Sequence, residues 1–62
     1  MQVIEIRVTL NERQAFQYAQ FLKRATFEDY RSRARNDDEA YVMIAAGGQI
    51  REALAEKGFA PR

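Results

Sequence analysis

The residues of this sequence that could do chemistry are charged side chains at short, regular spacing. Asp37, Asp38 and Glu39 are consecutive carboxylates that could hold a cation. No EF-hand loop pattern surrounds them, however, and acids at a helix N-terminus interact favourably with its dipole. We therefore interpret them as the beginning of a helix. The sequence has no His, no Cys and no glycine-rich phosphate loop, so we predict a non-enzymatic protein without catalytic residues, metal or cofactor.

Two further sets of residues could bind a nucleic acid. The first is Glu5, Arg7 and Thr9, which alternate with apolar residues and would stand on the open side of a strand. The second is the locally basic segment of the chain, whose cations could contact phosphates or an acidic protein patch: Lys23, Arg24, Arg31, Arg33 and Arg35. Two alternatives stay open. Glu5 could pair with Arg7 of a second copy, and the arginines could form a solvated, salt-bridged face.

The first ten residues must position Glu5, Arg7 and Thr9, and their pattern predicts a half-buried β-strand. Apolar and polar residues alternate there, and the apolar ones are largely β-branched. A lone strand leaves its backbone groups without partners, so we expect it to pair antiparallel with the same strand of a second chain. The predicted homodimer interface is the apolar side of this strand: Ile4, Ile6, Val8 and Leu10.

Helices must position the remaining candidates. Two pairs fit a capping box here, Thr9 with Glu12 and Asn11 with Gln14, so we expect a helix to start here and to run to about residue 25. Three aromatic residues within six positions of this helix cannot share one narrow face, so at least one should pack on another element or subunit. Another capping box at Thr26 and Asp29 predicts a short helix. Residues 36–39 then supply N-cap residues and acids for a long helix, which we expect over residues 39–57 and which Gly58 closes.

Two adjacent glycines leave two interpretations of the last helix open. Gly47 and Gly48 each cost roughly 1 kcal/mol relative to alanine inside a helix. Either another backbone packs closely there, or residues 41–44 form a second strand and residues 49–57 a separate helix. The fold class expected is therefore α+β: one N-terminal β-strand followed by two or three helices (β-α-α), in a single domain over residues 1–62.

Composition limits the function classes. Ten basic and nine acidic residues nearly balance, which is typical of a solvated globular surface rather than a polybasic tail. No apolar stretch is long enough for a bilayer, and no signal segment opens the chain. We therefore expect a cytoplasmic protein with no membrane partner. A domain this small rarely gains more than ~3–5 kcal/mol from its core, which also favours a dimer.

The order of elements resembles the ribbon–helix–helix family of DNA-binding proteins. The resemblance lies in Val3-Ile4-Glu5-Ile6-Arg7-Val8, the capped helix after it, and Ile50-Arg51-Glu52-Ala53-Leu54. It implies a dimeric transcription regulator whose outward strand residues, here Glu5, Arg7 and Thr9, contact the bases of duplex DNA. The sequence departs from that family where residues 25–38 separate the two helices.

A second resemblance covers more of the chain. Phe21-Leu22-Lys23-Arg24, Phe27-Glu28-Asp29-Tyr30-Arg31, Asp37-Asp38-Glu39-Ala40-Tyr41 and Gly58-Phe59-Ala60-Pro61-Arg62 are similar to a small uncharacterised bacterial family found partly on phage and mobile elements. It implies an accessory protein that binds and inhibits a host protein complex, in the manner of an anti-defence or anti-CRISPR protein. Two functions thus remain: a dimeric ribbon-type DNA-binding regulator, or a protein-binding inhibitor.

Overall fold

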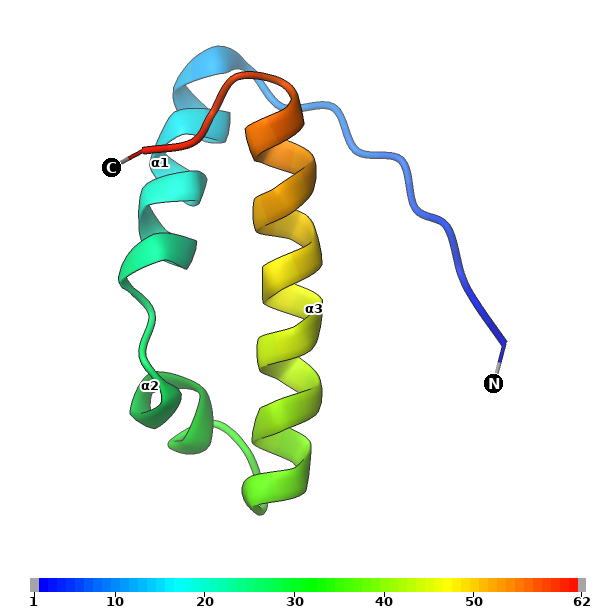
Figure 1. The fold of residues 1–62 in the computed structure, drawn as a ribbon, viewed down its shortest axis with the longest axis vertical. Helices are drawn as coiled ribbons and strands as arrows, with labels where there is room; N and C mark the ends of the chain where they lie inside the picture. Colours follow the sequence, from blue (N-terminus) through cyan, green and yellow to red (C-terminus); the bar gives the residue numbers. More distant parts are fainter. Residues whose placement is uncertain (1, 62) are drawn as a thin grey trace.

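Three helices make up the regular structure of the chain in a computed structural model that describes residues 2–61. They are α1 (Glu12–Arg24), α2 (Phe27–Arg31) and α3 (Asp37–Glu56). α1 and α3 lie side by side and antiparallel, and the short α2 packs beside the beginning of α3 (Figure 1). The described residues contain no strand. The fold is all-helical, and the α+β prediction is wrong.

The N-terminal segment accounts for this difference. Residues 2–10 form neither helix nor strand and are all exposed, and Figure 1 shows them running away from α1 on the other side of α3. Their alternating pattern permits an extended backbone, but a strand also needs a neighbouring backbone to accept and donate its hydrogen bonds. No other segment of the described chain is extended alongside them, so the β-α-α order predicted from the sequence fails at its first element.

The helix starts follow the sequence closely. Gln14 donates its backbone N–H to Asn11 Oδ1 at 2.7 Å, and Asn11 donates its own to Gln14 Oε1 at 3.0 Å. The same reciprocal box joins Thr26 and Asp29 before α2. Asn36 Oδ1 accepts the backbone N–H of the third residue of α3. Each cap satisfies backbone donors that a helix leaves free at its N-terminus, and the three predicted starts are confirmed to within two residues.

The end of α3 is also as predicted. Gly58 has a positive φ of 98°, which costs glycine little because it has no Cβ. The backbone N–H of Phe59 reaches the carbonyl of Leu54 at 2.9 Å, and that of Gly58 reaches Ala55 at 2.9 Å. These are the two hydrogen bonds of a Schellman cap. The Phe59 side chain accordingly packs on the core beside Leu54.

α3 continues through both glycines without a break, so the alternative of a strand at residues 41–44 is wrong. The two glycines differ in their surroundings. A Cβ added at Gly48 would meet nothing within 4 Å, whereas one at Gly47 would collide with the hydroxyl of Tyr30 and lie 3.7 Å from Leu22. Gly47 therefore gives the Tyr30 ring room to lie against α3. The expected close neighbour exists, but it is a side chain and not a backbone.

The core between the helices is small. Its buried members are Ala15, Ala19, Leu22 and Leu54, with Ala40 buried separately nearer α2. The overall extents are 34 × 28 × 15 Å. Viewed down the shortest axis, α1 and α2 both lie beside α3, and no helix is stacked in front of another (Figure 1). The chain thus forms one layer of helices, whereas a domain ordinarily buries its core between two.

Within residues 2–61, no helix is both long enough and apolar enough to cross a membrane.

Candidate functional site: an apolar groove beside the N-terminal segment

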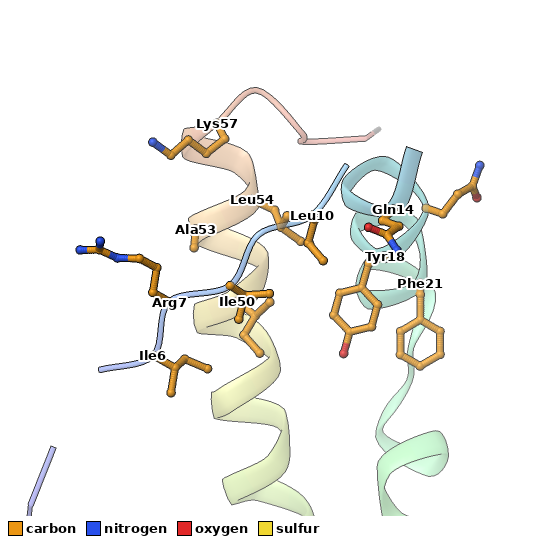
Figure 2. Close-up of a pocket in the computed structure, with 12 residues that line it drawn as sticks. Ile6, Arg7, Leu10, Gln14, Tyr18, Phe21, Ile50, Ala53, Leu54 and Lys57 are labelled. Carbon is orange, nitrogen blue, oxygen red and sulfur yellow. The ribbon is translucent and has the colours of Figure 1, made fainter. Parts of the chain in front are cut away.

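The main concave surface is a groove of about 880 Å³ bounded by three separate parts of the chain. We call it the apolar groove, and Figure 2 shows the side chains that line it. The N-terminal segment contributes Ile6, Arg7, Val8 and Leu10; α1 contributes Gln14, Gln17, Tyr18 and Phe21; α3 contributes Ile50, Ala53, Leu54 and Lys57. Arg7 and Lys57 are its only charged residues. The groove could therefore bury apolar surface, and its lining contains no carboxylate, His or Cys.

The α1 wall consists of an aromatic pair. Tyr18 and Phe21 are three residues apart, so they lie on the same side of the helix. Their rings stack with centroids 5.6 Å apart, yet Phe21 remains 59% exposed. Phe16 lies on another side of α1, in a shallow hollow beside the C-terminal segment. The prediction that three aromatics cannot share one face of this helix is confirmed.

The α3 wall is apolar because of its spacing. Ile50 and Leu54 are four residues apart and Ala53 lies between them, so all three lie on the side of α3 that lines the groove. Leu54 is buried in the core while Ile50, at 40% exposure, stands at the rim of the groove. Ile50 stays exposed because the single layer leaves that side of α3 uncovered.

The third wall carries the predicted dimer-interface residues. Exposure of their side chains falls toward α1, from 79% at Ile4 to 72% at Ile6, 66% at Val8 and 42% at Leu10. The last three line the groove. Glu5 and Thr9 of the predicted base-reading set are exposed as well, and Arg7 points away from the helices (Figure 2). Within one chain the alternation therefore does not separate a buried side from an open one.

The predicted basic residues lie elsewhere. Lys23 and Arg24 end α1, Arg31 ends α2, and Arg33 and Arg35 are in the connection to α3. In Figure 1 this region is on the opposite side of α3 from the N-terminal segment. The fold therefore does not bring the two predicted nucleic-acid-binding sets together.

Acidic residues neutralise much of this basic region. Arg31 Nε donates to Asp37 Oδ1 at 2.7 Å, and its Nη1 donates to the carbonyl of Ala34 at 3.0 Å. Glu39 Oε1 accepts the backbone N–H of Arg35 at 3.4 Å. The carboxylates of the helix start thus bind neighbouring groups of the chain. Within residues 2–61, His, Cys, Asp and Glu side chains form no cluster of three that could hold a metal ion.

The aromatic residues of the basic region are packed rather than free for stacking on bases. Phe27 lies against Tyr41 with ring centroids 5.3 Å apart, and Tyr30 is half-buried against Gly47. Both contacts hold α2 against α3. Phe27 and Tyr30 are therefore packing residues of the fold.

One carboxyl in this region has a perturbed pKa. The backbone N–H and the hydroxyl of Thr26 both donate to Asp29 Oδ2, at 2.8 and 3.0 Å. These bonds, the backbone one first, lower the pKa of Asp29 below its ordinary 3.8 because they favour the charged form. This side chain therefore serves as a helix cap.

The groove as a whole is what sequence reasoning missed. Its walls come from residues 6–10, 14–21 and 50–57, and no local pattern connects them. The one available signal was the crowding of aromatics on α1, which required a surface outside that helix for Tyr18 or Phe21.

Comparison with known proteins places the chain in a family but supplies no function. No curated protein and no solved structure matches it. Over residues 1–62 the sequence matches a family described as a family of unknown function (DUF7706), and the protein belongs to that family.

Proposed function

We propose that this protein is a non-enzymatic binding module that acts through protein–protein contacts at the apolar groove. The observation that carries the proposal is the exposure of large apolar side chains around one concavity: Ile6 is 72% exposed, Phe21 59% and Ile50 40%. Large apolar side chains gathered around one concavity are typical of interaction sites. Stacked aromatics in the wall of such a concavity are typical anchors of protein interfaces.

Nucleic-acid binding has less support. Residues 23–39 contain five basic side chains and five acidic ones, so the region that would contact phosphates has no net positive charge. Affinity for duplex DNA depends on an excess of cations. Arg31 is further held by Asp37 and a backbone carbonyl. The ribbon that would present Arg7 to a groove of DNA also lacks its strand in the described chain.

A host protein complex is one class of partner that fits this proposal. Inhibition of a host protein complex, as in an anti-defence protein, is one activity that a module of this kind can perform without catalysis. The cytoplasmic location expected from the sequence fits such a partner, and both remain predictions.

Site-specific photo-crosslinking tests the proposal in the producing cell. A benzoylphenylalanine replaces Phe21, an aromatic residue of the groove, in one variant and Lys23, at the basic end of α1, in the matched control. We expect protein adducts from position 21, identified by mass spectrometry of the cross-linked peptides, and few or none from position 23. Absence of protein adducts at position 21, whether or not nucleic acid is captured at position 23, would contradict the proposal.

A titration with random-sequence duplex DNA tests the competing function. We expect no saturable binding by fluorescence anisotropy even at low salt. Binding that weakens steeply with salt and is reduced in an Arg33→Ala/Arg35→Ala variant would instead establish the basic region as a phosphate-contacting surface.

A further inference from the structure

We infer that the occupant of the apolar groove is a second copy of this chain, the two copies placing their grooves face to face about a two-fold axis. This inference rests on the proposed protein-binding function and names its partner. It concerns the helical faces and their side chains, and it requires no pairing of strands.

The chain leaves more surface uncovered than a compact monomer of its mass does. The chain exposes 5807 Å², whereas a compact monomer of its 7.2 kDa mass exposes about 4,100 Å². The excess is about 1,700 Å², roughly twice the ~800 Å² per partner of a standard interface and within the ~1,000–2,500 Å² per partner of obligate homodimers. The uncovered area therefore matches what one subunit of a stable dimer buries.

The shape of the chain is less compact than that of a typical domain of its length. The radius of gyration is 12.6 Å, compared with about 10.6 Å for a compact domain of this length. The molecule is a single helical layer 15 Å deep, and a second layer is what such a fold lacks. A copy of the chain supplies a layer with the same outline and the same apolar face, which an isologous contact requires.

One side of α3 is nearly uncharged and extends the apolar surface beyond the groove. Val42, Ala46, Ile50 and Ala53 follow one side of α3 at intervals of three or four residues, and Val42 is 70% exposed. From residue 40 to residue 50 the chain has no charged side chain, and its net charge is only +1. Local repulsion between two copies is therefore limited to Arg7 and Lys57, the exposed cations of the groove, and the small net charge adds little to it.

The exposed apolar residues of the N-terminal segment also favour a second copy of the chain as the occupant. Val3 and Ile4 are 89% and 79% exposed, and Figure 1 shows this part of the segment beyond the edge of α3, where its own helices cannot cover it. A second copy presents a groove with walls of Tyr18, Phe21 and Ile50. Each chain then carries both the apolar segment and the surface able to bury it.

Sedimentation equilibrium of the full chain tests the inference, with two alanines of α3 as the matched pair. Ala53 lines the groove, whereas Ala55 lies on the opposite side of α3 and does not line it, yet both are exposed in the single chain. Glutamate at either position therefore fits the helix, four residues from Lys57 or from Arg51. We expect the unmodified chain to sediment at twice its 7.2 kDa mass. Ala53→Glu should raise the dimer dissociation constant about tenfold or more because a carboxylate inside the contact loses its hydration, and Ala55→Glu should leave it unchanged.

A second variant and a second measurement protect the test against simple misfolding. Ile6→Glu changes a groove residue outside every helix, so we expect weaker dimerisation by the same method. The melting temperature of the unmodified chain should also rise with protein concentration, because association stabilises the folded state by mass action.

The outcomes separate this inference from the proposed function. A chain that sediments at 7.2 kDa with a concentration-independent melting temperature would overturn the second copy as occupant. So would equal weakening by Ala55→Glu and Ala53→Glu. In either case, protein adducts at position 21 to a different protein would leave the proposed function standing, whereas adducts between two copies would support both statements.

Discussion

Individual residues decide how closely the helices approach, and Tyr30 and Gly47 show this most directly. The ring of Tyr30 occupies the space in which any other residue at position 47 would place its Cβ. Gly48, next along the helix, has no such neighbour. Two adjacent glycines with the same intrinsic helix propensity therefore have different reasons for being there, and only Gly47 is required by packing.

We expect Gly48→Ala to raise the free energy of unfolding by roughly 0.5–1 kcal/mol, the usual gain in a helix interior. Gly47→Ala should gain less or be destabilising, because its methyl group displaces Tyr30. Urea denaturation followed by circular dichroism measures both. In a Tyr30→Phe background, which lacks the obstructing hydroxyl, the difference between the two alanine variants should shrink. If Gly47→Ala stabilises as much as Gly48→Ala in the unmodified chain, the close contact is wrong.

At the level of the elements, helix caps explain why this chain divides as it does. α1, α2 and α3 each begin at a residue whose side chain accepts a backbone N–H of the first turn. α2 has only five residues and no buried side chain, so it depends on its cap and on the contacts of Phe27 and Tyr30. Its stability should therefore respond to the state of Asp29.

We expect α2 to lose the Asp29 half of its capping box in acid, while Thr26 Oγ1 still accepts the backbone N–H of Asp29. Asp29 binds Thr26 as a carboxylate, and its folded-state pKa is lowered from 3.8. The contribution of this half of the box is therefore complete above 3.8 and is lost as the pH falls through the lowered value. NMR titration of the Asp29 carboxyl and the α2 amides measures this. Thr26→Ala removes the hydroxyl bond but keeps the backbone one, so the pKa should move part of the way back toward 3.8. An unchanged pKa in that variant would show that the hydroxyl has no role.

At the level of the whole molecule, the single layer leaves little apolar surface buried. Three of the five buried residues are alanines, and Leu22 and Leu54 supply most of the buried volume between α1 and α3. A core this small makes the fold sensitive to one truncation and makes association with a partner the main remaining source of stability.

We expect Leu54→Ala to cost about 2–3 kcal/mol, the lower part of the range for buried leucines, because the site is at the edge of a small core. That would leave about 0–3 kcal/mol of the ~3–5 kcal/mol available to a domain of this size, so the urea midpoint should fall sharply and at most about half of the helical circular dichroism should disappear at 25 °C. Arg51→Ala, an exposed change in the same helix, should stay within about 0.5 kcal/mol. Equal effects of the two variants at the same protein concentration would contradict the position of the core.

The sequence by itself determined the helices. Asn11, Thr26, Asn36 and Gly58 each act on backbone groups within five residues, so local chemistry was sufficient to predict the starts of α1, α2 and α3 and the end of α3. Tertiary structure decided the rest. Residues 2–10 form no strand because backbone pairing needs a second segment that the described chain does not place beside them. α3 continues through Gly47 and Gly48 with the Tyr30 ring packed against it. The groove exists because three segments distant in the sequence meet around Tyr18, Phe21 and Ile50, and contacts between distant segments leave no periodic trace in any one of them.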